Sequence, residues 1–222
     1  MRDGVKFSCF NVIPSSLGLL LLMAIFSSLP GHAFAAEPIR IMALGDSLTA
    51  GYGLAANESF PAQLERELNA RGIPVQVINA GVSGDTTAGG LARLDWALAD
   101  SPDLVILALG ANDGLRAIDP EVTRANLDAI LKKLTSLNLP VLVAGIYAPP
   151  NLGKEYGAEF NRIFPDLAAE YNALLYPFFL AGVATDPTLN QDDGIHPNAQ
   201  GVTVVVQQIL PFVIRLIERL TT

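Results

Sequence analysis

Residues 39–48 read Ile-Arg-Ile-Met-Ala-Leu-Gly-Asp-Ser-Leu, a mainly apolar run that stops at a glycine followed by two polar residues. A short apolar run bounded by turn residues is typical of a strand buried in a parallel sheet. The polar residues behind it then lie at the carboxyl end of that strand, where open parallel sheets bind their ligands. This stretch therefore indicates an α/β fold and also the place of a site.

The same alternation continues along the chain. Three further apolar runs and a weaker fifth strand are expected at residues 75–78, 104–109, 141–146 and 174–179. Segments with helical spacing lie at residues 58–71, 86–99, 120–137 and 157–172. A last helix is expected from Pro197, a residue favoured at the first helical position, to about Leu220. Strands alternating with helices predict one parallel sheet with helices on both faces.

The first 35 residues have the features of a cleaved signal peptide. Arg2 and Lys6 precede an apolar run at residues 17–29, and residues 33–35 form a small-x-small cleavage pattern. Because the apolar run is short for a membrane-spanning helix, an uncleaved anchor is the less favoured alternative. The pattern predicts an exported protein, in the periplasm or the medium, with residues 36–222 as a single domain and no membrane span after cleavage.

Composition excludes several classes of function. The formal net charge is −8, and because residues 1–35 carry a net +1, the chain without them stands at −9. Such an acidic surface argues against nucleic acid as a partner. The only cysteine, Cys9, and one of the two histidines, His32, lie in the leader. His196 is then the only imidazole of the exported chain, and no metal site or cofactor is expected.

Four polar, glycine-rich segments carry the candidate chemistry, at residues 45–53, 81–86, 110–114 and 192–198. Each follows a predicted strand, and the carboxyl ends of parallel strands share one edge of the sheet. We therefore expect the four segments to meet at one place.

Ser47 and His196 are the candidates for nucleophilic catalysis. A free hydroxyl is a weak nucleophile at neutral pH, and His196 is the only imidazole that can serve as its base. Asp193, three residues before His196, would orient the ring, with Asp192 as its rival. Each pattern also has a purely structural interpretation, with Ser47 as a helix cap and His196 on a solvent-facing capping turn. A phosphate-binding loop is disfavoured because the required glycine and lysine spacing is missing.

Acyl transfer also needs hydrogen-bond donors for an oxyanion. The candidates are the backbone N–H groups of Ser47 and Gly84 and the side-chain amide of Asn112. In isolation the segment around Asn112 is more typical of a simple turn. Ser83 resembles the serine of a nucleophile elbow but lacks the final glycine, so it is not the expected nucleophile. Thr86 and Thr87 are expected to cap the following helix and not to contact substrate.

Taken together, the four segments resemble the SGNH hydrolase superfamily, also called GDSL-type lipases and esterases. The matching blocks are Gly-Asp-Ser-Leu-Thr-Ala-Gly-Tyr at 45–52, Asn-Ala-Gly-Val-Ser-Gly-Asp-Thr at 79–86, Gly-Ala-Asn-Asp-Gly-Leu-Arg at 110–116 and Asp-Asp-Gly-Ile-His-Pro-Asn at 192–198. Within the superfamily the chain is most similar to the branch of periplasmic thioesterase I, arylesterase and lysophospholipase enzymes. The resemblance implies a flavodoxin-like three-layer α/β/α sandwich with a five-stranded parallel sheet.

The resemblance also implies site residues and an activity. Ser47, Asp193 and His196 match the catalytic triad, and Ser47, Gly84 and Asn112 match the oxyanion donors. The Ser-Gly-Asp-Thr context favours Gly84 over the nearby Gly81. The implied reaction is hydrolysis of carboxylic esters and thioesters through an acyl-enzyme, with aryl esters, acyl-CoA and lysophospholipids as substrates. The expected partners are small molecules, and the protein is expected to be a monomer.

Substrate selection is expected in the loop after the fourth strand, at residues 147–152. Apolar residues near the predicted loops are candidates for an acyl-chain groove, with ordinary packing as the alternative for each. They are Leu48, Leu54, Leu115, Ile146, Tyr147, Pro149 and Leu152. Two other interpretations stay open, a carbohydrate acetyl esterase of the same superfamily and a flavodoxin-like binding module without catalytic activity.

Overall fold

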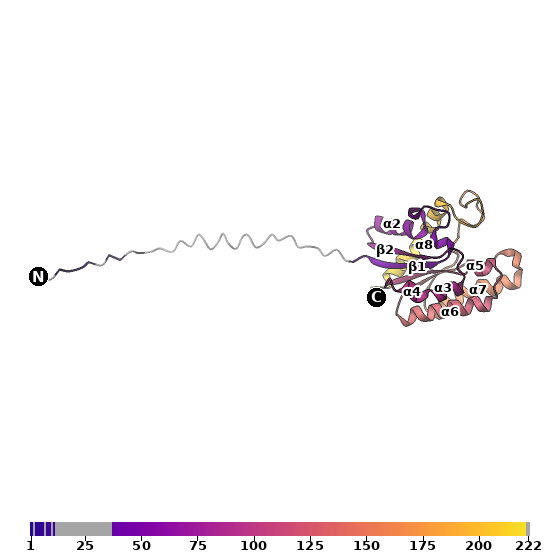
Figure 1. Ribbon diagram of the computed structural model, residues 1–222, viewed down its shortest axis with the longest axis horizontal. Helices are drawn as coiled ribbons and strands as arrows, with labels where there is room; N and C mark the ends of the chain where they lie inside the picture. The colour runs from indigo at the N-terminus through magenta and orange to yellow at the C-terminus, as the bar shows by residue number, and fades with distance from the viewer. Residues whose placement is uncertain (2, 7, 10, 12–36, 221–222) are drawn as a thin grey trace. The chain divides into compact units, whose positions relative to one another are not determined.

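A five-stranded parallel sheet, in the order β2-β1-β3-β4-β5, forms the centre of the domain (Figure 1). Its strands are β1 (Ile39–Gly45), β2 (Val75–Gly81), β3 (Leu104–Ala108), β4 (Val141–Ala144) and β5 (Leu174–Tyr176). The computed structural model describes residues 1, 3–6, 8–9, 11 and 37–220, so the predicted signal peptide falls largely outside the described residues. Glu37–Thr222 is one compact unit.

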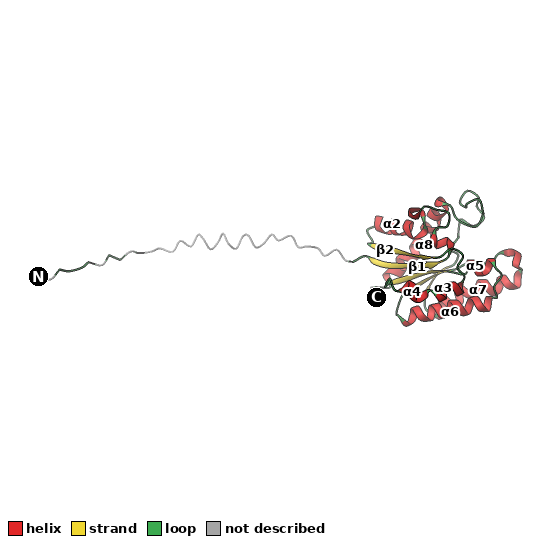
Figure 2. Ribbon diagram, viewed as in Figure 1, coloured by secondary structure: helices red, strands yellow, loops and turns green. Residues whose placement is uncertain are grey.

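Helices cover both faces of this sheet (Figure 2). α2 (Phe60–Ala70) and α8 (Ala199–Glu218) pack together on one face. The other face carries α3 (Thr87–Ala92), α4 (Leu94–Leu98), α6 (Pro120–Ser136) and α7 (Lys154–Glu170). Four short elements lie in the loops, namely α1 (Ser47–Ala50), the 3₁₀ turn η1 (Ala56–Glu58), α5 (Ala111–Leu115) and the 3₁₀ turn η2 (Pro150–Leu152). The predicted three-layer sandwich is confirmed.

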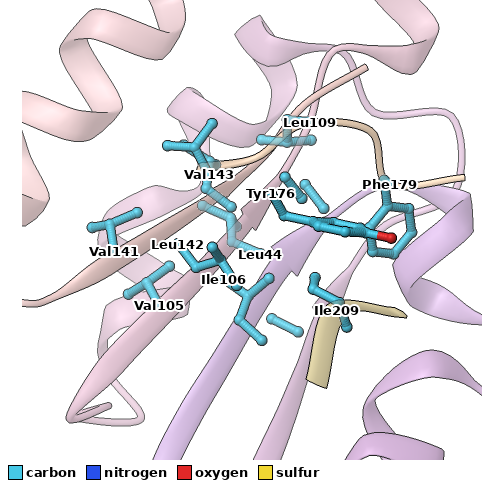
Figure 3. Close-up of a cluster of buried hydrophobic side chains, with 14 of the residues drawn as sticks. Leu44, Val105, Ile106, Leu109, Val141, Leu142, Val143, Tyr176, Phe179 and Ile209 are labelled. Atoms are coloured by element: carbon cyan, nitrogen blue, oxygen red, sulfur yellow. The ribbon is translucent and has the colours of Figure 1, made fainter. Parts of the chain in front are cut away.

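Burial follows the position of each strand in the sheet. β3 lies in the middle of the sheet, and all five of its residues are buried. β2 is an edge strand, where buried Val75, Val77 and Ala80 alternate with exposed or half-buried neighbours. Figure 3 shows Leu44, Ile106 and Leu142 of adjacent central strands in one cluster. A continuous apolar run therefore belongs to a strand covered on both faces, as the sequence predicted.

Helix α8 combines apolar composition with a buried face. Among the described residues it is the one helix long and apolar enough to cross a membrane. One face of it, including Val205, Ile209 and Val213, is buried, and the helix contacts α2, β4 and β5. Packing within the domain accounts for its composition.

Two helices differ from the expected ranges. The segment predicted as one helix over 86–99 is two helices, broken at Arg93, whose side chain points back to Asp85 and the Gly45 carbonyl. The last helix does not begin at Pro197. That residue pairs with Asn190 in an isolated bridge, and the side chain of Asn198 caps the helix by accepting the N–H of Gly201 at 2.9 Å. Of the two threonines expected to cap α3, Thr86 does so by accepting the N–H of Gly89, whereas Thr87 is already the first residue of the helix.

The core predicts a clear stability difference. Ile106 of the central strand β3 is fully buried, so Ile106→Ala should lower the free energy of unfolding by about 2–5 kcal/mol through lost burial and the cavity left behind. Val122→Ala on the exposed side of α6 should change it by about 0.5 kcal/mol or less. Urea unfolding of both variants measures the difference, and equal midpoints would contradict this description of the core.

Candidate active site

The loops after β1, β2 and β3 begin at the same level. In the register of the sheet, Gly45 at the end of β1 pairs with Gly81 of β2 and with Ala108 of β3. The order of the strands also reverses direction at β1, and such a switch point is where open α/β sheets bind ligands. Because of this register, the glycine-rich segments after β1, β2 and β3 lie close together, as predicted.

Ser47 lies at the start of α1, directly after β1. Gly45 has no room for a side chain, because a Cβ there would overlap Thr49. Asp46 is the N-cap of α1 and accepts the N–H of Leu48 at 3.0 Å, so the interpretation of Ser47 as the cap is wrong. As the first residue of the helix, Ser47 has a backbone N–H without an intrahelical partner. Its hydroxyl is left to face the neighbouring loops.

Asp46 is a buried carboxyl group beside Ser47. Only 1% of the residue is exposed, and this burial raises its pKa to about 6. The N–H of Leu48 and the charge of His196 oppose the shift. The other carboxyl oxygen, Oδ2, lies 3.4 Å from Nδ2 of Asn112. At neutral pH the carboxylate is therefore mostly ionised and within reach of the Asn112 amide.

His196 connects Ser47 with Asp193. Its Nε2 lies 2.9 Å from the Ser47 hydroxyl oxygen, and its Nδ1 lies 2.7 Å from Oδ2 of Asp193. The hydrogen bond to His196, together with the N–H groups of Ile195 and His196, lowers the pKa of Asp193 to about 2. An ionised carboxylate can only accept, so Nδ1 carries a proton, and in the neutral imidazole the lone pair of Nε2 then faces Ser47.

The turn that carries His196 is built around the same carboxylate. Oδ1 of Asp193 accepts the backbone N–H groups of Ile195 and His196, both at 3.0 Å. Asp193 thus holds the backbone of the turn with one oxygen and the ring with the other. Its rival Asp192 is exposed and makes no hydrogen bond to the imidazole among the described residues.

The candidate oxyanion donors lie on three different loops. Gly84 has φ +84°, a left-handed conformation that favours glycine, and no acceptor for its N–H is found among the described residues. Gly81 is a glycine for another reason, since a Cβ there would overlap the backbone of Ala50. Nδ2 of Asn112 donates to the carbonyl of Asp85 at 2.9 Å, so Asn112 is tied to the Gly84 loop.

Two arginines that the sequence did not single out hold the Gly84 loop. Arg93 Nε donates to the Asp85 carboxylate at 2.6 Å, and its Nη2 donates to the Gly45 carbonyl at 2.9 Å. Arg116 Nη2 donates to the Gly84 carbonyl at 2.9 Å. Arg93 therefore joins the end of β1 to the loop after β2. Its contacts are long-range, and helical spacing alone carries no signal for them.

Asp113, which the sequence analysis also missed, anchors the Asn112 loop to the neighbouring helices. It is fully buried and accepts the Thr87 N–H at 2.8 Å, the Thr87 hydroxyl at 2.5 Å and the Thr123 hydroxyl at 3.2 Å. A buried carboxylate needs such donors. The network joins α5 to α3 and α6, so the loops of Gly84 and Asn112 are fixed relative to each other.

The apolar candidates differ in burial, and Leu54, Pro149 and Leu152 are half-buried. Leu48 and Ile146 belong to the core, with 9% and 6% of their surface exposed. Leu115 and Tyr147 are about half exposed, and Tyr147 stacks on Phe178, which the sequence did not single out. Pro149 lies against Gly114. Among the described residues, no group of three or more His, Cys, Asp or Glu side chains could hold a metal ion.

Known proteins share this fold and much of this sequence. The GDSL-like Lipase/Acylhydrolase family matches residues 43–204. An arylesterase of Vibrio mimicus is 42% identical over 182 residues, covering 82% of this chain and 90% of the relative. Thioesterase 1/protease 1/lysophospholipase L1 of Escherichia coli K12 is 41% identical over 165 residues, covering 74% and 78%. The crystal structure of AlinE4, an SGNH-hydrolase family esterase, superposes with TM-score 0.69 at 49% identity, covering 81% and 96%.

Sheet order, helical layers and relatives together define a three-layer α/β/α hydrolase. The chain belongs to the GDSL-like lipase/acylhydrolase family, and it is an ester hydrolase.

The buried Asp46 predicts a pH dependence of stability. Its folded-state pKa of about 6 lies above the ordinary value of 3.8, so the folded protein binds this proton more tightly than the unfolded chain does. The contribution of Asp46 is therefore most favourable below about pH 4 and falls by on the order of 3 kcal/mol as the pH rises through 6. In urea unfolding, wild type should lose stability relative to Asp46→Asn between these pH values. A difference that stays constant with pH would contradict the shift.

Proposed function

We propose that this hydrolase cleaves carboxylic esters and thioesters with Ser47 as nucleophile, His196 as general base and Asp193 as the group that orients His196. The observation that carries the proposal is the pair of distances at His196, 2.9 Å to Ser47 and 2.7 Å to Asp193. A base within hydrogen-bond reach of the hydroxyl, itself held by a carboxylate, is the arrangement that activates a serine.

In the proposed reaction, Nε2 of His196 takes the Ser47 proton while the Ser47 oxygen attacks the acyl carbon. The oxyanion accepts hydrogen bonds from the N–H groups of Ser47 and Gly84 and from the Asn112 amide. His196 then gives its proton to the departing alcohol or thiol, which leaves an acyl-enzyme. Water, deprotonated by His196, attacks the acyl-enzyme and releases the acid and the free Ser47 hydroxyl.

The proposed substrates are aryl esters, acyl-CoA and lysophospholipids, all with an apolar acyl chain. The names of the Vibrio mimicus and Escherichia coli relatives support this class. The exposed apolar surface of Leu115 and Tyr147 supports it as well, because these residues follow β3 and β4 at the edge of the sheet that carries Ser47. We propose that Leu115, Tyr147 and Pro149 contact the acyl chain, whereas Leu48 and Ile146 support them from the core.

We further propose that residues 1–35 are a signal peptide and that the enzyme acts as a monomer in the periplasm after cleavage. The support is the positive start, the apolar run at 17–29 and the small-x-small pattern at 33–35. Mass spectrometry of the protein purified from the periplasm should find Ala36 as the N-terminus.

The nucleophile is tested by Ser47→Ala. Loss of the hydroxyl should lower kcat for a short p-nitrophenyl ester by on the order of 10⁴-fold or more, with the free energy of unfolding little changed. Wild-type protein should also be labelled by a fluorophosphonate, and the variant should not. Hydrolysis by Ser47→Ala at the wild-type rate would exclude Ser47 as the nucleophile. Labelling of another residue in the wild-type protein would identify that residue as the nucleophile instead.

The acyl-chain contacts are tested with p-nitrophenyl acetate, butyrate, octanoate and laurate. If a chain is buried against Tyr147, each methylene that contacts it should add up to about 0.8 kcal/mol of binding. Tyr147→Ala should then reduce kcat/KM for octanoate much more than for acetate, and Val122→Ala on the exposed face of α6 should alter neither. Equal loss for all four esters would argue against contact with the chain.

A further inference from the structure

The segment that carries Asp193 and His196 has little regular structure of its own. It runs from β5 to α8, residues 177–198, and the described part holds only one isolated bridge, between Asn190 and Pro197. It must nevertheless hold the imidazole 2.9 Å from Ser47, a residue 149 positions earlier in the chain. The precision of this contact therefore depends on the bonds between the segment and the Ser47 loop.

Gln191 makes these bonds. Its Nε2 donates to the carbonyl of Tyr52 at 2.8 Å and to the carbonyl of Pro197 at 3.0 Å, which uses both amide hydrogens. Its backbone N–H donates to the carbonyl of His196 at 2.8 Å. Gln191 thus binds the carbonyls of two consecutive residues, His196 and Pro197, and also reaches the loop after α1.

The bond to Tyr52 is one of few links to the Ser47 loop; just beyond the segment, Gln63 Nε2 also joins the carbonyls of Glu58 (2.8 Å) and Ala199 (3.1 Å). Between residues 45–58 and 177–198, the described hydrogen bonds are two, the Ser47–His196 contact itself and the Gln191–Tyr52 bond. Gly53 makes room for the second, because a Cβ there would overlap Oε1 of Gln191. Gly53 has φ +75°, so its conformation also favours glycine.

Tyr52, which Gln191 holds, also contacts the imidazole of His196 with its ring. Its ring centroid lies 4.6 Å from that of His196, with the planes tilted by 37°. Gln191 donates a hydrogen bond to the backbone carbonyl of Tyr52, which fixes the backbone from which this ring projects. Asp193 fixes the imidazole at Nδ1, and Tyr52 limits its movement from one face.

We propose that Gln191 is a positioning residue, which, through its bonds to Tyr52 and Pro197, keeps Nε2 of His196 within reach of the Ser47 hydroxyl. The inference rests on the proposed function, since it assumes that His196 acts on Ser47. Gln191 itself touches neither Ser47 nor the ring of His196 among the contacts described.

The test is Gln191→Met, which keeps the length of the side chain and removes both donors. The variant is titrated with a fluorophosphonate, and kcat is expressed per titrated site, so that misfolded protein does not count. We expect kcat for p-nitrophenyl butyrate to fall roughly 10- to 100-fold with KM within about twofold, because misplacement of a catalytic group by about 1 Å has this size of effect. The rate of fluorophosphonate labelling should fall by the same factor.

Asn190→Leu is the matched control. Asn190 Nδ2 also donates two hydrogen bonds to carbonyls of the same segment, Val183 and Asp186, both at 2.7 Å, but does not reach the Ser47 loop. It should lower stability and leave kcat per titrated site unchanged. Tyr52→Ala should lower kcat as Gln191→Met does, and Tyr52→Phe, which keeps the ring, should restore it.

The outcomes separate the two proposals. Activity in Ser47→Ala would remove the proposed function and this inference with it. An inactive Ser47→Ala combined with wild-type kcat per titrated site in Gln191→Met would overturn only the positioning role. An equal loss of kcat in Asn190→Leu would overturn it too, because any weakening of the segment would then have the same effect.

Discussion

The register of β1 between β2 and β3 is the constraint on which the site depends. Because Gly45 pairs with Gly81 on one side and with Ala108 on the other, three loops leave the sheet at one level. A shift by one residue would turn every buried side chain of β1 to the opposite face. The apolar core that fixes the register thereby also fixes the distance between Ser47 and the loops of Gly84 and Asn112.

Three carboxyl groups near the site differ because their surroundings differ. Asp46 is buried with few donors, and its pKa is raised to about 6. Asp193 accepts from an imidazole and two backbone N–H groups, and its pKa is lowered to about 2. Asp113 is also buried but accepts three hydrogen bonds from two threonines. Asp46 and Asp113 are thus buried groups that differ in their donors, whereas Asp193 accepts as many hydrogen bonds as Asp113 from an exposed position.

Much of the architecture follows from local patterns, and most of the supporting contacts do not. Apolar runs predicted all five strands, and the polar segments behind them predicted which residues meet. Arg93, Asp113 and Gln191 were missed because each acts on residues distant in sequence, where periodicity and turn chemistry carry no information. The start of α8 was misplaced for a related reason: Pro197 is typical of a first helical turn, but its bridge to Asn190 holds it outside the helix.

The amide of Asn112 is already occupied before any substrate arrives. One hydrogen goes to the Asp85 carbonyl at 2.9 Å, and the other faces Oδ2 of Asp46 at the longer distance of 3.4 Å. In the proposed reaction a neutral substrate carbonyl would have to compete with a carboxylate for that second hydrogen, whereas the full charge of an oxyanion competes on equal terms. In the proposed reaction this resting contact would favour the transition state over the bound ester, which adds selectivity to catalysis without adding affinity for the substrate.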